Sequence, residues 1–459
     1  MQLISFYERT FVAVHKHLRY MKTVKNIFLC LGASLFAMVH LGAQELEGSH
    51  TLDNGIKMSL YDDATATVKD GKNCTGDISI PKIFSTNGRT YTVTGIEATA
   101  FAGNKNITYI ILPSTLKKIG GQAFKDCTKL KDFLQGPEII ESIDYSPFEN
   151  TAWLKSQQGR LVYFKGWIVG TNFDAGQYQK DCNILEGTIG MVEGCPSINA
   201  YNIYLPKTFK HVTANMSGYA TQKFIVDDDN PTLMSDSYGA IYSRKKVSYL
   251  YSDQQQMSIS VTGQALLCTP WGNNNAVFRI APGTKTIEKN ALYRCQAKQI
   301  IIPEGVQYIL EGAFEDLANC EIIDLPASVD ELTTSFFNYK GAIIFRTQYY
   351  MPGSSEKNFR KCNEATLYIH ETAYVRFVLT NYKDKFKAVK YIENGVPSLY
   401  EAGDVNHDGT INSADVVAVY NYIVQGNASG ISKDDADVNT DNAVNATDIT
   451  TVYNIISGN

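Results

Sequence analysis

Apolar and polar positions repeat along the middle of the chain at intervals of 22 or 23 residues. In four segments an apolar residue is followed by three or four small or polar residues and then by Ala-Phe or Ala-Leu. The alanines of these pairs are Ala100, Ala123, Ala291 and Ala313. A Cys or Asn follows, and where the unit is complete a short β-branched run ends in Pro. A degenerate copy occupies residues 189–209.

This repeat predicts a solenoid. A unit of 22 or 23 residues is too small to bury its own apolar face, so the units must stack to form one continuous core. The β-branched runs Tyr109–Leu112, Gln299–Ile302 and Ile322–Leu325 predict short strands along one face. The Pro after each run ends the strand. We expect the Ala-Phe pairs to point into the core from the opposite side.

The repeat resembles the BspA-type leucine-rich repeats of bacterial surface proteins, over residues 48–393. The resemblance implies departures from perfect repetition at three places. Residues 149–170 and 224–251 are similar to hairpin insertions of this family, and residues 365–392 are similar to its strand–helix–strand cap. It also implies an extended binding surface for a protein or glycan partner.

The cysteines follow the repeat. Cys127, Cys195, Cys295 and Cys320 fall at or near one repeat position, just after the Ala-Phe pair or its equivalent. Because that position points inward and Cys packs as a small apolar residue, we expect buried free thiols. Disulfides are the alternative in a secreted chain. Cys74 and Cys362 lie outside this register and receive no assignment.

A second pattern, a duplicated acidic loop, lies near the C-terminus. Asp404–Asp415 reads DVNHDGTINSAD, and Asp437–Asp448 reads DVNTDNAVNATD, 33 residues later. Hard cations such as Ca²⁺ take oxygen ligands from loop positions 1, 3, 5, 7, 9 and 12. Gly409 and Asn442 tolerate the unusual backbone of position 6. The ligands predicted for two calcium ions are Asp404, Asn406, Asp408, Thr410, Asn412, Asp415, Asp437, Asn439, Asp441, Ala443, Asn445 and Asp448.

Each loop leads into a predicted helix, 416–423 or 449–456, with one apolar face. Together the loops and helices resemble a type I dockerin module. The resemblance implies a cohesin-like partner, or another surface protein, held through residues 402–459. The contact residues it implies are Ser413, Ala414, Tyr420, Asn421, Ala446, Thr447, Tyr453 and Asn454. The alternative is a calcium-stabilised tail with no cohesin partner.

The N-terminus predicts a secretory signal peptide. From Met21, the basic residues Lys22 and Lys25 precede the apolar stretch Ile27–Leu41, and a small-residue cleavage site lies before Gln44. That stretch is shorter than the roughly 20 residues needed to span a bilayer. An uncleaved anchor is the alternative. Residues 1–20 fit no signal pattern, so we expect translation to start at Met21.

Composition and motifs limit the classes of function that the sequence supports. The formal net charge is −5, and residues 402–459 hold eight Asp and one Lys, so no basic patch favours nucleic acid. No GxSxG, HExxH or phosphate-binding glycine loop is present. The acidic run 227–230 favours a turn over a metal or glycan site. Trp153, Trp167 and Trp271 favour core packing over sugar stacking.

The sequence therefore predicts an α+β repeat fold, a leucine-rich-repeat solenoid followed by a small all-α calcium-binding domain. The expected divisions are a signal region at 1–43, a β cap at 44–95, the solenoid with insertions and cap at 96–393, a linker at 394–401 and the dockerin-like domain at 402–459. We expect a secreted, non-enzymatic binding protein that does not span the membrane. The alternative is an accessory component of a cell-surface or cellulosome-like polysaccharide-degrading complex.

Overall fold

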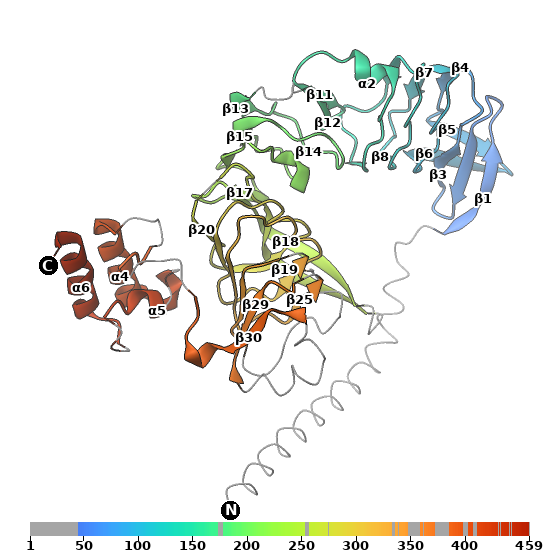
Figure 1. Ribbon diagram of the computed structural model, residues 1–459. Helices are drawn as coiled ribbons and strands as arrows, with labels where there is room; N and C mark the ends of the chain where they lie inside the picture. The colour runs from blue at the N-terminus through green and yellow to red at the C-terminus, as the bar shows by residue number, and fades with distance from the viewer. Residues whose placement is uncertain are drawn as a thin grey trace, which may run out of the picture. The chain divides into compact units, whose positions relative to one another are not determined.

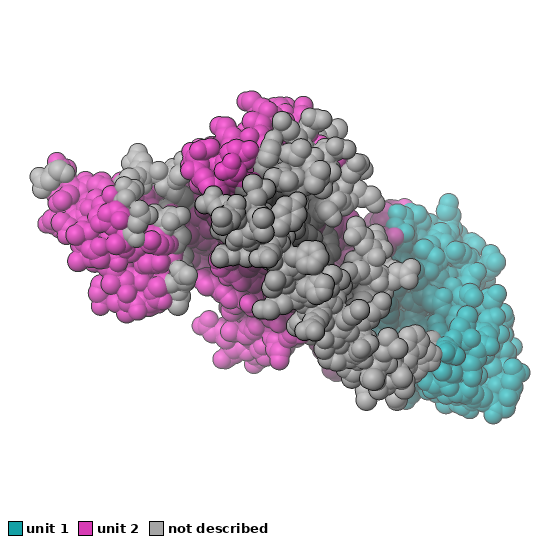
Figure 2. Space-filling model, turned by 90° about the horizontal axis from the view of Figure 1, so that it is seen from below, with its two compact units in different colours: residues 1–137 teal, residues 138–459 magenta. Residues whose placement is uncertain are grey.

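The computed structural model describes residues 45–172, 178–252, 257–273, 275–332, 336–337, 339–347, 359–360, 362–371, 385–397, 403–406, 411–429, 431, 433–439, 441 and 443–458. The predicted signal region 1–43 lies outside these residues. The chain divides into two compact units, 1–137 and 138–459, coloured separately in Figure 2.

Unit 1 holds an antiparallel cap and the first repeats (Figure 1). Its larger sheet runs in the order β1 (Leu46–Thr51), β2 (Lys57–Tyr61), β3 (Thr65–Asp70), β6 (Arg89–Ile96) and β8 (Lys118–Ile119), and β5 (Ile83–Thr86) pairs with β6. Its second sheet is the parallel ladder β4 (Gly76–Ser79), β7 (Ile107–Leu112) and β9 (Asp132–Gln135). Pairing is antiparallel from β1 to β3 and becomes parallel from β3 to β8.

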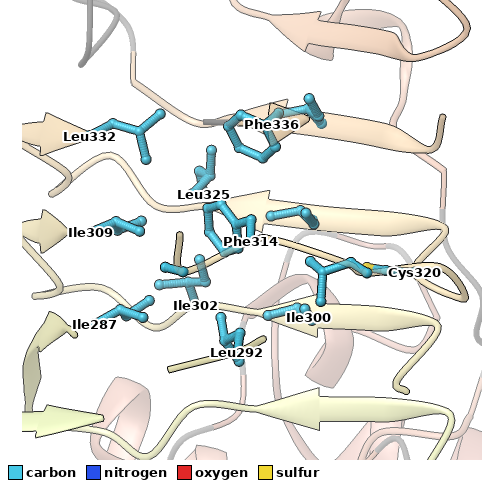
Figure 3. Packing of buried hydrophobic residues seen from close by; sticks show 14 of the residues in the cluster. Ile287, Leu292, Ile300, Ile302, Ile309, Phe314, Cys320, Leu325, Leu332 and Phe336 are labelled. Atoms are coloured by element: carbon cyan, nitrogen blue, oxygen red, sulfur yellow. The ribbon is translucent and has the colours of Figure 1, made fainter. Parts of the chain in front are cut away.

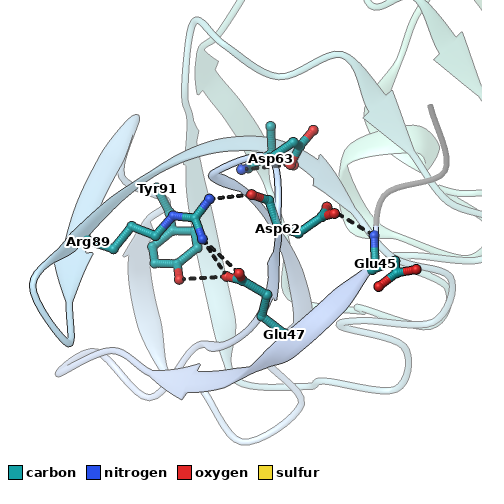
Figure 4. Close-up of polar contacts among 7 residues, drawn as sticks. Glu45, Glu47, Asp62, Asp63, Arg89 and Tyr91 are labelled. Atoms are coloured by element: carbon teal, nitrogen blue, oxygen red, sulfur yellow. Dashed lines mark hydrogen bonds and ion pairs between the residues drawn. The ribbon is translucent and has the colours of Figure 1, made fainter. Parts of the chain in front are cut away.

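A polar cluster ties the first strand to this cap (Figure 4). Arg89 Nη1 donates to both carboxylate oxygens of Glu47, at 2.7 and 2.9 Å, and the Tyr91 hydroxyl donates to the same carboxylate at 3.1 Å. The other Arg89 nitrogen donates to the carbonyl of Asp62, whose carboxylate accepts from the backbone N–H of Glu45. Because the ion pair is exposed, its contribution to stability is at most about 1 kcal/mol.

Unit 2 begins with a hairpin and a short parallel ladder. Its first elements are β10 (Ser142–Ile143), α2 (Ala152–Ser156), the antiparallel hairpin β11 (Leu161–Phe164) and β12 (Trp167–Thr171), and β14 (Gly190–Met191), which pairs in parallel with β12. The ladder is β13 (Gln179–Asn183), β15 (Ala200–Leu205) and β16 (Lys223–Val226). The antiparallel strands β17 (Leu233–Ser235), β18 (Ile241–Ser252) and β19 (Met257–Cys268) follow the 3-10 helix η1 (Ala214–Met216).

The later repeats of unit 2 form two parallel ladders. The first contains β20 (Val277–Arg279), β22 (Gln299–Ile301), β24 (Ile322–Leu325), β27 (Ala342–Phe345), β29 (Thr366–Ile369) and β30 (Ala388–Tyr391). The second contains β19, β21 (Thr284–Ile287), β23 (Tyr308–Ile309) and β25 (Glu331–Leu332). β26 (Phe336–Phe337) pairs with β28 (Phe359–Arg360), and η4 (Ile392–Asn394) follows β30.

The sequence-based strand predictions are confirmed. The runs expected at 109–112, 299–302 and 322–325 are β7, β22 and β24. The second ladder was not predicted, so strands line two sides of the coil in these repeats. Of the cap implied for 365–392, both strands are present as β29 and β30, and residues 372–384 between them lie outside the described residues.

The repeated Ala-Phe and Ala-Leu pairs form the core, as expected. All eight members are buried: Ala100, Phe101, Ala123, Phe124, Ala291, Leu292, Ala313 and Phe314. The rings of Phe101 and Phe124 stack with centroids 5.2 Å apart. Phe314 stacks in the same way on Phe336 at 5.0 Å, and Figure 3 shows these rings in successive coils. A single aromatic position therefore stacks from one coil to the next.

The cysteines pack in this core as thiols. All eight cysteines of the described residues are free and buried. The Cys127 thiol donates to the Phe101 carbonyl at 3.1 Å, and the Cys362 thiol to the Phe336 carbonyl at 2.9 Å, each 26 residues back. Cys362, which received no assignment from the sequence, thus fills the repeat position of Cys127. Burial raises the pKa of Cys127 to about 12 and that of Cys362 to about 11.

We expect these thiols to be inert in the native protein. At pH 8 a thiol with a pKa of about 11 is ionised roughly one part in a thousand, and only the thiolate reacts. In a chain that starts at residue 44, a disulfide-exchange reagent such as Ellman's reagent should label no thiol within minutes before denaturation and all eight afterwards. A rapidly labelled native thiol would contradict the buried positions. Fewer than eight labels after denaturation without reductant would indicate disulfides.

The chain ends in a small helical region. Its elements are α4 (Ser413–Gln425), η5 (Gly426–Ser429), α5 (Lys433–Ala436) and α6 (Ala446–Ser457). The helices predicted at 416–423 and 449–456 lie within α4 and α6. Within the described residues, no helix is long and apolar enough to cross a membrane.

Candidate metal centre and docking face

The first acidic loop is closed by the carboxylate of Asp415, which is fully buried. One oxygen accepts the backbone N–H of Asn406 at 2.9 Å, and the other accepts that of Asn412, also at 2.9 Å. Asn412 is the N-cap of α4 and accepts from the backbone N–H of Ala414 with its side-chain oxygen at 2.8 Å. This reciprocal capping box satisfies backbone donors at the helix start and fixes Asp415 against the loop.

The second loop repeats this arrangement. Asp448 is fully buried, and its oxygens accept from the backbone N–H groups of Asn439 at 3.2 Å and Asn445 at 2.9 Å. Asn445 caps α6 and accepts from the backbone N–H of Thr447 at 2.9 Å. The two predicted position-12 carboxylates therefore have the same partners at the same loop positions.

The predicted ligands of the second loop converge on one another. The backbone N–H of Asp441 donates to side-chain oxygens of both Asp437 and Asn439, at 3.0 Å each. The Asp441 carboxylate accepts from Asn439 Nδ2 at 3.0 Å and from the backbone N–H of Ala443 at 2.8 Å. Oxygens from positions 1, 3 and 5 are thus gathered on one side of the loop.

The charge of this region favours a bound cation. Four aspartates at the first and last loop positions are buried: Asp404, Asp415, Asp437 and Asp448. The region holds eight Asp and one Lys, and that residue, Lys433, is exposed. Buried carboxylates are costly unless they are paired or coordinate a metal. A set of carboxylate, amide and carbonyl oxygens with no sulfur or imidazole fits a hard cation such as Ca²⁺.

The described residues include all six ligands predicted for the second loop and four of the six predicted for the first. Asp408 and Thr410, the other two ligands predicted for the first loop, lie outside the described residues. Among the residues described, no three His, Cys, Asp or Glu side chains are grouped to hold a metal ion. In the second loop the backbone N–H of Asp441 is the group that the side-chain oxygens surround. The predicted ligands that are described offer carboxylate, amide and carbonyl oxygens, and four of the aspartates are buried. This oxygen-only chemistry fits calcium.

The predicted contact residues lie on the surface of α4 and α6. Ser413, Ala414, Ala446 and Thr447 are exposed in the first turns. One to two turns later Tyr420 is 57% exposed and Tyr453 63%, each followed by its Asn. Asn421 is partly buried and Asn454 exposed. Both helices thus present an equivalent set of side chains to the solvent.

The apolar pattern of α4 extends onto this surface, which the sequence did not predict. Val417 and Val424 are exposed, three and four residues from Tyr420, so they form one outward stripe with it. Within the described residues, the buried apolar residues of the region are Val405, Ala418, Val419, Ala436 and Val452. Ile423 and Ile456, expected on the apolar face, are both 41% exposed. Helical spacing correctly predicted an apolar face on each helix, but the small core of the region buries only part of that face.

The other features considered from the sequence are structural. Asp227 accepts the backbone N–H of Asp229 at 2.9 Å. The Asn230 side chain is buried and donates to the carbonyls of Pro206 and Phe209. The acidic run is therefore the turn expected. Three tryptophans are buried, in agreement with a core role: Trp153, Trp167 and Trp271.

Parallel ladders of short strands followed by a duplicated loop–helix unit define a repeat solenoid joined to a small helical module. Two family models match the chain: the BspA type leucine rich repeat region, in six copies over residues 84–159 and 273–375, and the dockerin type I domain, over residues 402–457. The chain is a BspA-type leucine-rich-repeat protein that carries a C-terminal type I dockerin domain.

A comparison with solved structures finds bacterial leucine-rich-repeat proteins. The chain is similar to a leucine-rich repeat protein from Eubacterium ventriosum (18% identity, 76% of this chain and 85% of that chain, TM-score 0.38). It is also similar to a leucine rich cell surface protein from Faecalibacterium prausnitzii (17%, 76% and 95%, TM-score 0.37) and to a leucine-rich repeat protein from Bacteroides ovatus (15%, 77% and 100%, TM-score 0.25). No curated protein matches this chain.

The two families support a binding role. Both are non-catalytic binding domains, and their combination supports a protein-binding role within a complex. Type I dockerin domains in general bind calcium and cohesin-type partners. Proteins with these domains are typically found at the cell surface or outside the cell.

Proposed function

We propose that this chain is a secreted, non-enzymatic binding protein that is tethered by a calcium-dependent dockerin domain. In this proposal residues 21–43 direct secretion, the solenoid of residues 96–393 binds a protein or glycan, and residues 402–459 bind two Ca²⁺ ions. The observation that supports it is the pair of buried carboxylates, Asp415 and Asp448, with equivalent partners in two loops. A duplicated site of this kind suits two ions better than one.

Calcium would supply the positive charge that balances the negative loop carboxylates and would hold the loops against the helices. The twelve residues predicted from the sequence are the proposed ligands, with Thr410 and Ala443 contributing backbone carbonyls. With the loops fixed, α4 and α6 present Tyr420, Tyr453 and their flanking residues as a rigid surface. We propose that this surface docks onto a cohesin-like module or another surface protein.

A binding measurement tests the docking role. The purified full chain is passed over immobilised cohesin modules with calcium or with a chelator. We expect binding only with calcium. Tyr420→Ala combined with Tyr453→Ala should weaken it at least 100-fold, because central aromatic residues of an interface contribute about 2 kcal/mol or more each.

The matched control is Tyr145→Ala, which removes an exposed tyrosine from a different part of the chain and should bind as the unmodified chain does. Failure of every cohesin module to bind the calcium-loaded chain would contradict the cohesin partner. Equal binding with and without calcium would contradict the dependence on the loops.

A further inference from the structure

Three aromatic rings lie against the guanidinium group of Arg294 in unit 2. The guanidinium carbon is 5.0 Å from the ring centroids of Tyr219 and Tyr293 and 5.2 Å from that of Trp271. Arg294 Nε donates to the Asp316 carboxylate at 2.7 Å, and Nη1 donates to the Tyr219 hydroxyl. Cation–π contacts and charge-assisted hydrogen bonds both stabilise this arrangement. These five side chains form the Arg294 cluster.

The Arg294 cluster joins four segments that are distant in the sequence. Tyr219 lies between η1 and β16, and Trp271 lies between β19 and β20. Arg294 lies between β21 and β22, and Asp316 lies between β23 and β24. The first two segments are also joined through the backbone, because the N–H of Trp271 donates to Ser217 Oγ at 2.7 Å. The cluster is therefore built from several loops that support one another.

Tyr219 is the member of the cluster with the most exposed ring. It is 65% exposed, whereas Trp271 is 5% exposed. Among the described residues between 205 and 416, no other large hydrophobic side chain is exposed. Single exposed aromatic residues are common on protein surfaces. Tyr219 differs from them because Arg294 bonds its hydroxyl and lies against its ring, so a ligand bound there would cost less side-chain entropy.

A free hydrogen-bond donor and a free acceptor lie in the same cluster. Arg294 Nε and Asp316 Oδ2 bond each other, but Arg294 Nη2 and Asp316 Oδ1 have no hydrogen-bond partner in the part of the chain that the structure describes. Both side chains reach the solvent, with exposed fractions of 27% for Arg294 and 51% for Asp316. An exposed aromatic ring and a free donor–acceptor pair are thus held together.

Amide side chains border the Arg294 cluster. Gln296 Nε2 donates to the Arg294 carbonyl at 2.7 Å, and Gln296 Oε1 accepts from Asn319 Nδ2 at 2.7 Å. Gln222 Nε2 donates to the carbonyl of Gly272, next to the tryptophan, at 2.6 Å. Asn319 Oδ1 and Gln222 Oε1 have no hydrogen-bond partner of their own within the described ranges. The surroundings of the ring therefore offer further polar contacts.

We infer that the Arg294 cluster binds an oligosaccharide, with one sugar ring packed on Tyr219. The C–H face of a sugar ring is apolar and can cover an aromatic ring. Adjacent hydroxyl groups on the edge of that sugar can accept from Arg294 Nη2 and donate to Asp316 Oδ1. The bordering amides can bond the hydroxyls of the next sugar unit. This inference rests on the proposed binding role of the solenoid and assigns it a ligand class.

A protein partner fits this surface less well. A stable protein interface buries about 800 Å² on each side around an apolar centre. Tyr219 provides a single exposed ring, and the groups beside it are amides and charged side chains. A sugar needs only one ring face together with polar groups at its edge.

Calorimetric titration of sugars tests the inference. The purified full chain is titrated with cellohexaose, xylohexaose, mannohexaose and maltohexaose, whose sugar units carry adjacent free hydroxyl groups. We expect at least one of them to bind. Tyr219→Ala should weaken that binding about 10-fold, which corresponds to about 1.4 kcal/mol and lies within the range of an aromatic contact.

Two further variants separate the ring from the polar groups. Tyr219→Phe keeps the ring and should weaken binding less than Tyr219→Ala does. Asp316→Asn keeps the shape of the side chain and should weaken binding roughly 3- to 10-fold, because hydrogen bonds to charged groups are stronger than those to neutral ones. The exposed Tyr145→Ala, in another part of the same unit, should change nothing.

The same titrations separate this site from the tether. Because the cluster lies outside the acidic loops, a calcium chelator should leave sugar binding unchanged. Loss of calcium-dependent docking with intact sugar binding would therefore refute the tether alone. Sugar binding that Tyr219→Ala leaves intact would refute this site but keep the binding role of the solenoid.

Two other results would also overturn the inference. One is that none of the four hexasaccharides binds. The other is that an unglycosylated protein binds and Tyr219→Ala abolishes its binding. Unchanged melting temperatures of the variants would exclude misfolding as the cause of lost binding.

Discussion

Removal of calcium is expected to unfold α4 and α6 while the solenoid stays folded. Within the described residues, the C-terminal domain buries four carboxylates and only five apolar side chains, so we expect its folded state to depend on the ions that neutralise the loops. A ligand held at 100 times its dissociation constant stabilises the folded state by about 2.7 kcal/mol, so two ions would contribute about 5 kcal/mol. Hydrogen exchange read by mass spectrometry should show loss of protection in peptides from 413–425 and 446–457 when a chelator is added.

Substitution of the position-12 residues should reproduce this effect without a chelator. Asp415→Asn combined with Asp448→Asn keeps the side-chain shape but removes the charge that calcium requires. The matched control is Asp53→Asn, which alters an exposed aspartate of the N-terminal cap and should leave exchange unchanged. Helices that remain protected in chelator would show that the domain folds without metal.

Phe124→Ala is expected to destabilise unit 1 by about 3–5 kcal/mol, the usual cost of removing a fully buried aromatic ring. Phe124 has no exposed surface, stacks on Phe101 at 5.2 Å and meets Phe133 edge-on at 4.9 Å. The substitution therefore interrupts the aromatic column between neighbouring coils. Urea denaturation followed by circular dichroism measures the loss.

The control for this substitution is Leu134→Ala on β9, because Leu134 is exposed and its truncation should change stability by less than about 0.5 kcal/mol. Solenoids can unfold in parts, so the comparison uses the first transition of each curve. A loss below about 1 kcal/mol for Phe124→Ala would contradict the role given to the column.

The repeat could be predicted from the sequence because its signals are local. The Ala-Phe pairs, the β-branched runs and the following Pro recur at nearly constant spacing, and the strands and core positions follow from them. The second ladder carries no such signal. Its strands β23 and β25 have two residues each, too few for an alternating pattern to be visible.

The corners of the coil could not be predicted for a different reason. Two positions in each repeat adopt left-handed backbone angles. Each position gives a set of four residues from four repeats, and only one residue of each set is glycine. The sets are Thr99, Gln122, Asn290 and Gly312, and Gly103, Asp126, Arg294 and Asp316. A non-glycine residue in this conformation costs roughly 1–2 kcal/mol, so packing between coils must impose it. Residue identity therefore does not show these turns.

The candidate metal ligands could be predicted from the spacing of the loop residues, whereas the contacts around these ligands could not. Loop positions and the 33-residue offset identify Asp415 and Asp448 as position-12 residues from the sequence alone. The backbone partners of these carboxylates depend on how the loop folds over the helix start. The exposure of Val417 depends on what the rest of the domain covers. Periodicity assigns residues to faces of a helix but does not tell which face is buried.

Calorimetric titration of Ca²⁺ into the purified full chain tests the central claim most directly. The duplicated loops predict two ions per chain, one ion after Asp448→Asn and none after Asp415→Asn is added. The exposed Asp53→Asn variant should still bind two. A chain that takes up no calcium, or that binds two ions after both position-12 residues are replaced, would contradict the duplicated site.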